Sequence, residues 1–308
     1  MFSPKLKGSK LRTHHMHRAL ASLIYVAALC FVAVPLSAAT AAEQLAAGRA
    51  ALDRDDNEKA VELFSKAIEL QPNNAEAHYL LGLAYGDLAQ RSNILKQASL
   101  AKKTRAEFER AVELDPNYLD ARFMLINFYL LAPGFMGGGD DKALAQAAEI
   151  RRRDSIEGHR AYARVYTHQK KTDLVRKEFV EAVRENPKSG RAHYLLAGFL
   201  INEKTWPAAL HELDMALQVD PAYMPIHLRL GAHAALSGSN YTRGEESLRK
   251  YLTHKPGNNE PPLAAAWYWL GQIQEKQGKK NEAKQSYRNG LKLAPNDKQL
   301  REAVGRLQ

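Results

Sequence analysis

A fixed spacing of small and large residues recurs along the chain and constrains its fold more than any other feature. In the stretch from Ala266 to Pro295, Gly271, Ala283, Tyr287 and Pro295 follow one another at steps of 12, 4 and 8 residues. The same steps recur upstream in three sets: Gly48, Ala60, Phe64 and Pro72; Ala163, Val175, Phe179 and Pro187; Ala197, Ala209, Leu213 and Pro221. A constant stride of this kind indicates an array of similar structural units.

Three more copies of the pattern carry insertions. Compared with the regular spacing, ten residues are added between Gly82 and the pair Phe108 and Pro116. Five are added between Ile126 and the pair Ala143 and Ala147. One is added between Gly231 and the set Gly244, Leu248 and Pro256. All three insertions fall before the second helix that we expect in each unit. The ten extra residues are predicted to lengthen that helix by about 15 Å.

The spacing has a physical reading as a pair of packed helices. A Gly or Ala on each helix lets the two approach closely, a large residue fills the space beside them, and a Pro ends the second helix. Each pair would leave one apolar face uncovered, and only a neighbouring pair can bury it. The pattern therefore predicts an all-α fold of serially stacked helix pairs.

These residues resemble the tetratricopeptide repeat (TPR) family, whose unit has small, large and Pro residues at these offsets. The resemblance implies an α-solenoid, a right-handed superhelix of about seven helix-turn-helix repeats whose first helices line a concave groove. The predicted repeats are 41–74, 75–118, 119–155, 156–189, 190–223, 224–258 and 264–297.

The ends of the array depart from the repeat. Residues 297–308 predict a capping helix, because Asp297 can cap its start and Leu300, Val304 and Leu307 form one apolar stripe.

In the third repeat Ile126 replaces the usual Gly or Ala, and Ser155 stands near the place of Pro. The pattern therefore predicts the helix packing of this repeat less well than that of the other six.

The N-terminus is predicted to be a secretory signal, residues 1–41. A basic stretch without acidic residues precedes the apolar run "ALASLIYVAALCFVAVPL", which is followed by the small residues "SAATAA". An uncleaved anchor is the alternative, since 18 apolar residues approach the length of a membrane span. We therefore expect an exported protein of bacterial type with a TPR domain over 42–308, periplasmic or secreted, or alternatively anchored in the inner membrane.

Export changes the charge of the chain. The formal net charge of +10 falls to +5 when the five basic residues of the signal are removed, and the single cysteine, Cys30, leaves with it. An exported protein of modest charge seldom meets nucleic acid, so no nucleic-acid partner is expected. A membrane partner is expected only if the signal is retained.

No catalytic or metal-binding motif is complete. The loop "PGFMGGGDDK" lacks the Lys and Ser or Thr of a phosphate loop, and "HELDM" lacks the second His of a zinc protease. His78, His159, His193 and His227 share the fourth position of their repeats. Packed helices lie too far apart for these to share a metal, so a role in helix packing is favoured. We predict no enzyme activity, no cofactor and no metal.

The first helices carry the candidate binding residues. In the TPR family the second, fifth, ninth and twelfth positions of these helices face the groove, which here implies a set of aromatic, amide and arginine side chains. The candidates are Tyr79, Phe123, Asn127, Arg160, Arg164, Tyr194, Asn202 and Tyr268. Such side chains suit capture of an extended peptide, and Arg160 with Arg164 could hold a carboxylate. The alternative is that these residues pack against neighbouring repeats.

The insertions predict a second surface. Phe135 and Met136 stand between glycines in the five-residue insertion, at the same edge as the lengthened helix. Insertions in repeat proteins often cluster on a binding face. The favoured alternative is that Phe135 folds back onto Ile94 and Leu95, because an exposed apolar tip is costly without a partner.

The sequence thus predicts a non-enzymatic scaffold of the bacterial cell envelope that holds an extended segment of a partner protein in a preformed groove. Two alternatives remain. One is an accessory subunit that docks onto and positions a cell-wall or polysaccharide-processing enzyme. The other is a membrane-anchored assembly factor.

Overall fold

The computed structural model of the protein describes residues 40–257 and 260–307. Nearly all of the predicted signal, residues 1–41, lies outside this part, so its cleavage and its role as an anchor stay predictions. Within the described residues, none of the helices combines the length and the apolar character needed to cross a membrane.

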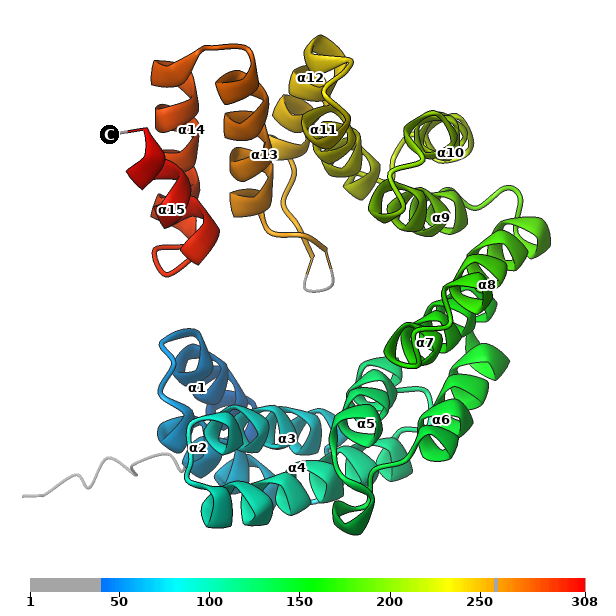
Figure 1. The fold of residues 1–308 in the computed structure, drawn as a ribbon. Coiled ribbons are helices and arrows are strands. Elements are labelled where there is room, and N and C mark those ends of the chain that lie inside the picture. The colour runs from blue at the N-terminus through cyan, green and yellow to red at the C-terminus, as the bar shows by residue number, and fades with distance from the viewer. Residues whose placement is uncertain (1–39, 258–259, 308) are drawn as a thin grey trace, which may run out of the picture. The chain divides into compact units, whose positions relative to one another are not determined.

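The described part of the chain consists of fifteen α-helices and one 3-10 turn, without any strand. The helices form seven successive hairpin pairs and a final single helix (Figure 1). The pairs are α1 Ala41–Asp53 with α2 Asn57–Leu70, α3 Ala75–Gln90 with α4 Ile94–Leu114, α5 Leu119–Leu131 with α6 Asp140–Arg153, α7 Ser155–His168 with α8 Thr172–Glu185, α9 Gly190–Asn202 with α10 Trp206–Val219, α11 Pro225–Ser237 with α12 Tyr241–Leu252, and α13 Leu263–Lys276 with α14 Lys280–Leu293. The predicted all-α TPR superhelix is confirmed.

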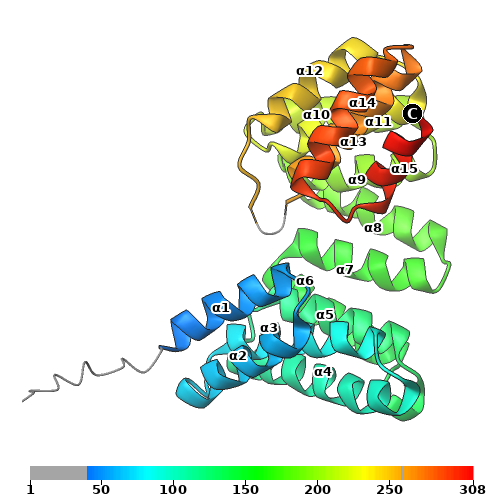
Figure 2. The same ribbon diagram turned by 90° about the vertical axis from the view of Figure 1, so that its left-hand side faces the viewer.

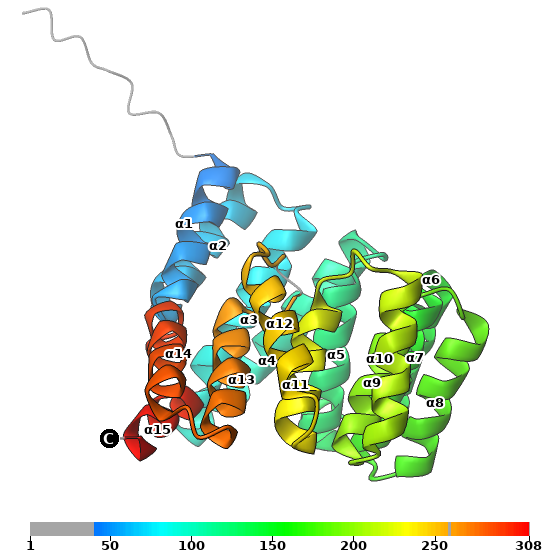
Figure 3. The same cartoon turned by 90° about the horizontal axis from the view of Figure 1, so that it is seen from above.

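Each helix packs on its pair partner and on the next pair along the chain. The most extensive contacts join α3 to α4 and α13 to α14. Further contacts join the second helix of each pair to the first helix of the next, as between α2 and α3. The pairs α13–α14, α11–α12, α9–α10 and α7–α8 follow one another in Figure 3, and Figure 2 shows the first pairs from the side. Burial is therefore shared between neighbours, as in other solenoids.

The small and large residues of the repeat meet as the spacing predicts. A methyl group added at Gly82 would lie 2.6 Å from Cε1 of Phe108, and one added at Gly48 or Gly271 would overlap the ring of Phe64 or Tyr287. Phe64 and Tyr287 are fully buried. The glycines thus let the first helix touch the ring that the second helix supplies.

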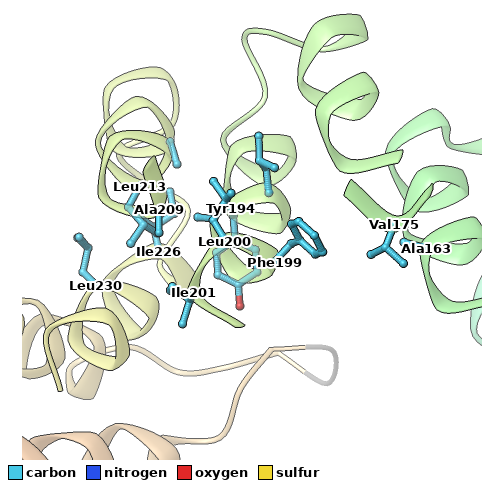
Figure 4. Close-up of a cluster of buried hydrophobic side chains, with 13 residues drawn as sticks. Ala163, Val175, Tyr194, Phe199, Leu200, Ile201, Ala209, Leu213, Ile226 and Leu230 are labelled. Carbon is cyan, nitrogen blue, oxygen red and sulfur yellow. The ribbon is translucent and has the colours of Figure 1, made fainter. Parts of the chain in front are cut away.

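The same pattern builds the buried interior at each junction between pairs. In Figure 4, Ala209 and Leu213 of α10 and Ile226 of α11, all fully buried, lie beside Leu200 of α9. These residues come from three consecutive helices. One cluster therefore packs α9 against α10 within a pair and α10 against α11 of the next pair.

The capping helix is present as α15, Lys298–Arg306. Asp297 is its N-cap and accepts a hydrogen bond from the backbone N–H of Leu300 at 2.9 Å. Leu300 and Ala303 are buried against the last pair, so α15 covers the apolar face that has no further repeat to pack on.

The two larger insertions take different forms. The first produces a 21-residue α4, whereas α2, α6, α8, α10 and α14 each have 14 residues. The second forms a turn between α5 and α6 that contains the short 3-10 helix η1, Gly134–Met136. Phe135 on this turn is 89% exposed, so it does not fold back into the interior.

A single residue joins the third and fourth pairs. Asp154 is both the C-cap of α6 and the N-cap of α7, where its side chain accepts from the backbone N–H of Glu157 at 2.9 Å. Gly158 allows this close junction, because a methyl group there would overlap Cα of Arg151. The third and fourth repeats are therefore joined tightly at the place where Ser155 stands near the position of the usual Pro.

Candidate functional site

The first helices of the second to fifth pairs line a cleft of about 740 Å³. It receives five of the eight predicted groove residues: Tyr79, Phe123, Asn127, Arg160 and Arg164. The remaining lining residues are Asn117, Tyr118, Leu119, Asp120, Met124, Asp154, Glu157 and Arg191. We call this the first-helix cleft.

Aromatic rings form one wall of the first-helix cleft. The ring centroids of Tyr79 and Tyr118 are 4.9 Å apart, and both rings are half-buried. Burial raises the pKa of both phenols. The two hydroxyl groups therefore stay protonated at neutral pH and can donate hydrogen bonds to a ligand.

A buried carboxylate organises the arginines of this cleft. Glu157 is only 3% exposed, accepts a hydrogen bond from Nε of Arg160 at 2.6 Å, and also pairs with Arg191. The guanidinium of Arg160 lies 4.1 Å from the ring centroid of Phe123. Arg160 is thus already neutralised and stacked, and in this arrangement it is not free to bind a ligand carboxylate with Arg164.

Arg164 has more capacity left. Its Nε donates to Oδ1 of Asn127 at 3.0 Å, and its guanidinium has no ion pair within residues 40–257 and 260–307. The side chain is exposed. Its terminal N–H groups are available to an acceptor in the cleft.

A second hollow, of about 290 Å³, adjoins the cleft and shares Arg160 and Arg164 with it. Its other lining residues are Ala163, Thr167, Val175, Phe179, Leu195, Gly198, Phe199, Asn202 and Arg229. The lining thus contains three arginines and no carboxylate. We call it the arginine hollow.

Arg229 is placed in the arginine hollow by its neighbours. Its guanidinium lies 3.7 Å from the ring centroid of Tyr194, and a methyl group at Gly198 would overlap its Nη1. The side chain is half-buried, and no ion pair to it is found in the described part of the chain. Stacking holds the cation in place while its N–H groups stay unused.

Two predicted groove residues do not reach either hollow. Tyr194 is 9% exposed and packs edge-to-face on Tyr223, with centroids 5.4 Å apart. Tyr268 packs on Trp269 and Tyr287, with centroid distances of 5.0 and 6.1 Å. For these two rings the alternative of packing within the solenoid describes the structure, whereas Asn202 lies in the arginine hollow.

Four residues that line the two hollows were not among the predicted groove residues: Tyr118, Glu157, Arg191 and Arg229. Glu157 and Arg191 stand at second positions of their repeats, which the family pattern already directs to the groove. Arg229 stands at a sixth position, where neither period nor motif marks it. In the structure Arg229 lies against Gly198, whose lack of a side chain leaves room for the guanidinium.

The histidines at fourth positions act as contacts between helices. Nδ1 of His78 lies 2.6 Å from Glu107 and Nε2 lies 3.1 Å from the carbonyl oxygen of Pro72. His193 makes the same two contacts, with Glu212 at 2.6 Å and the carbonyl of Pro187 at 3.0 Å. Each ring thus ties the two helices of its pair to the end of the preceding pair, as the packing interpretation predicts.

The other two histidines vary this arrangement. His159 bonds to two carboxylates, Glu178 at 2.7 Å and Glu185 at 3.1 Å. His227 is 6% exposed, and neither of its ring nitrogens has a hydrogen-bond partner in the part of the chain that the structure describes. Among the residues that the structure describes, no cluster of three or more His, Cys, Asp or Glu could hold a metal ion.

Comparisons with known proteins agree with this architecture. A family model described as TPR repeat matches residues 48–88, and one described as tetratricopeptide repeat matches residues 264–297. The chain is 27% identical over 124 residues to the general transcriptional corepressor ssn6 of Schizosaccharomyces pombe and 30% identical over 95 residues to Hsp70-Hsp90 organizing protein 2 of Arabidopsis thaliana. These matches cover 40% and 31% of this chain but only 11% and 16% of the relatives.

Solved structures show the same fold at low identity. A tetratricopeptide repeat protein from Parabacteroides merdae is 14% identical with a TM-score of 0.50, over 87% of this chain and 98% of that one. Yeast Tom70 is 16% identical with a TM-score of 0.52, over 88% and 64%. A human IFIT1 dimer with m7Gppp-AAAA is 20% identical with a TM-score of 0.55, over 87% and 62%. From its repeats, its helix pairs and these matches, the chain is a tetratricopeptide repeat protein.

Proposed function

We propose that the protein is a non-enzymatic scaffold that holds an extended segment of a partner protein along the first-helix cleft and the arginine hollow. The observation that carries this proposal is the continuity of the two hollows, which share Arg160 and Arg164. Half-buried rings in the cleft can take apolar side chains of the segment. The phenols and amides beside them can bond its backbone.

The arginine hollow supports a more specific ligand chemistry. Arg164 and Arg229 have unused N–H groups, and the lining supplies no carboxylate to satisfy them. A carboxylate of the bound segment, from an acidic side chain or a C-terminus, would fit between them and gain charge-assisted hydrogen bonds. Arg160 contributes through its stacked face on Phe123 instead of its charge.

The basic stretch and the apolar run at the N-terminus support export of this scaffold to the cell envelope, with retention of the run as the alternative. Mass spectrometry of the protein purified from its own host tests this part. A mature N-terminus close to Ala41 supports cleavage, and an intact N-terminus supports the anchored form.

Peptide selection tests the binding function. A displayed library of random short peptides is selected on the purified domain, and the enriched peptides are synthesised with fluorescein and measured by anisotropy. We expect enriched peptides to carry a carboxylate. Replacing Arg164 and Arg229 together by Gln should weaken their binding by at least about tenfold, since a charge-assisted hydrogen bond contributes about 1.5–3 kcal/mol.

Two further variants make the result decisive. Arg288→Gln removes one positive charge from an exposed position on α14 that lines neither hollow and should leave the affinity unchanged. Gly198→Ala should weaken binding without removing any charge, because the added methyl group displaces Arg229. If no peptide is enriched, or if the enriched peptides bind all variants equally, the proposed site is wrong.

A further inference from the structure

The charges that line the two hollows of the proposed function are distributed unevenly. The first-helix cleft is lined by three carboxylates and three arginines, whereas the described lining of the arginine hollow has three arginines and no carboxylate. The formal charge of the lining therefore rises from zero in the cleft to +3 in the hollow, although Arg160 and Arg164 belong to both. A segment bound along both hollows would meet a neutral surface at one end and a strongly positive one at the other.

Glu157 is the carboxylate that neutralises arginines of the first-helix cleft. It lies in the first turn of α7, and its side chain is 3% exposed. Its Oε2 lies 2.5 Å from Nη2 of Arg160, one turn further along the same helix, and its Oε1 pairs with Arg191 of α9. Each carboxylate oxygen is therefore paired with an arginine of a different helix.

Neighbouring side chains fix this group of three charges. Oδ1 of Asp154 accepts a hydrogen bond from the backbone N–H of Glu157 at 2.9 Å, and Oδ2 of Asp154 lies 3.9 Å from Nη1 of Arg191. The ring of Phe123 lies against the guanidinium of Arg160, with 4.1 Å to the ring centroid. The charges are therefore balanced before any ligand enters the cleft.

An acidic side chain of a ligand could pair with Arg160 or Arg191 only by displacing Glu157. Displacement would leave a buried carboxylate without its partners, which is strongly unfavourable. While Glu157 keeps its partners, its own charge repels the incoming carboxylate. Arg164 and Arg229 impose no such cost, because neither has an ion pair among residues 40–257 and 260–307. The site thus discriminates through an unfavourable interaction with the wrong ligand.

We propose that Glu157 sets the charge selectivity of the site, so that the first-helix cleft takes uncharged side chains and the arginine hollow takes the one acidic group of the segment. This inference rests on the proposed function and deepens it. The partner is then a segment in which one acidic group adjoins a run of apolar, aromatic or amide residues, and not a polyacidic stretch. Glu157 is a positioning residue, because it acts through Arg160 and Arg191.

The probes are fluorescein-labelled peptides that the wild-type domain enriches from the random library. Each uncharged position of the tightest peptide is replaced in turn by glutamate, glutamine and lysine, and the affinities are measured by anisotropy. The positions that matter lie about three or more residues from the essential carboxylate, roughly 10 Å of extended chain. At none of these positions should wild type bind the glutamate peptide more tightly than the glutamine peptide.

Two variants shift the charge of the first-helix cleft in opposite directions. Glu157→Gln keeps the size of the side chain and leaves the charges of Arg160 and Arg191 unbalanced. At least one of the glutamate peptides should therefore bind this variant at least about tenfold more tightly than it binds wild type. Arg191→Gln, at a side chain that is 44% exposed, leaves carboxylates in excess. It should strengthen at least one lysine peptide and weaken the matching glutamate peptide. A merely structural role of Glu157 would not produce effects of opposite sign.

Glu149→Gln is the matched control. Glu149 of α6 also pairs with two arginines, Arg152 and Arg153, but it lines neither hollow. This change should leave the affinities of all peptides unchanged. Thermal melts verify that the variants are folded, and Arg191→Gln decides the question by itself if Glu157→Gln does not fold.

The selectivity and the proposed function can fail separately. Enriched peptides that need several acidic residues, or an unchanged charge preference in either folded variant, would overturn the selectivity and leave the peptide site in place. Enrichment of no peptide by the wild-type domain would overturn the proposed function, and the selectivity with it.

Discussion

Replacing His227 by leucine should largely remove one component of acid destabilisation, so that the variant loses about 2 kcal/mol less unfolding free energy than the wild type between pH 7 and pH 5. Burial, and then the nearby charges of Lys250 and Arg243, lower the pKa of His227 from 6.5 to about 4. Among residues 40–257 and 260–307 neither ring nitrogen has a hydrogen-bond partner, so no contact found there stabilises the charged ring.

The sign follows from the two pKa values. Because the folded state binds the proton of His227 more weakly than the unfolded state does, stability is fully present above pH 6.5. It is lost progressively as the pH falls toward 4. His159 acts in the opposite sense: burial lowers its pKa, but the hydrogen bonds that its ring donates to Glu178 and Glu185 outweigh burial and raise the pKa. Its contribution is full below pH 6.5 and is lost as the pH rises through the raised value.

Urea unfolding of wild type and variant at a series of pH values measures this difference. Comparing the two proteins cancels the contribution of His159, which both retain. The control is His211→Gln, which removes a histidine at an exposed position on α10. Parallel curves for wild type and His227→Leu would mean that the buried ring does not titrate as described.

Placing a methyl group at Gly82 should lower the unfolding free energy by about 1–3 kcal/mol, the usual cost of overpacking a filled core. The added carbon would lie 2.6 Å from the ring of Phe108, which is 4% exposed and has little room to move. In an ordinary helix position the same change is stabilising, because alanine has the higher helix propensity. A loss at Gly82 therefore reports contact between α3 and α4.

A double-mutant cycle measures that contact. Phe108→Leu alone should also destabilise, by about 0.5–3 kcal/mol, since it shrinks a buried ring. The double variant should lose less than the two single variants together, because leucine leaves space for the methyl group; we expect coupling of about 0.5–3 kcal/mol. Gly305→Ala, at an exposed glycine of α15 where an added Cβ would meet no other group of the described residues within 4 Å, should not destabilise. Strict additivity would show that the glycine and the ring do not share one space.

The fold was predictable because its determinants are local and repeated. The contact of Gly82 with Phe108 and the capping of α15 by Asp297 depend on a helical period and on short-range hydrogen bonding, both of which the sequence displays. Stacking of the pairs follows, since a helix pair with an uncovered apolar face has to pack on its neighbour.

The details of the candidate site depend on choices between partners that no period encodes. Arg160 could have pointed to Arg164 or to Glu157, and the buried carboxylate also attracts Arg191 from the next pair. Tyr194 occupies a groove position, but Arg229 and Tyr223 cover its ring. Both outcomes rest on side chains of different repeats, where sequence spacing fixes the helix faces but not the pairing.

The exposure of Phe135 could not be predicted from the sequence either. Apolar character alone favoured burial against Ile94 and Leu95, but the backbone of the turn is fixed by its bonds to Tyr129 and Arg105. A glycine-rich turn can adopt backbone conformations that other residues cannot, and Gly137 has φ of 96°. Hydropathy carries no information on this geometry.

The single residue between α6 and α7 has a mechanical consequence. Asp154 leaves only one pair of soft backbone torsions at this joint, whereas four residues, Asn186 to Ser189, separate α8 from α9. A ligand that displaces Arg164 of α7 would therefore move α6 together with α7. The longer linkers on either side would act as the hinges of this movement. The helices α6 and α7 would then move as one rigid body within the solenoid.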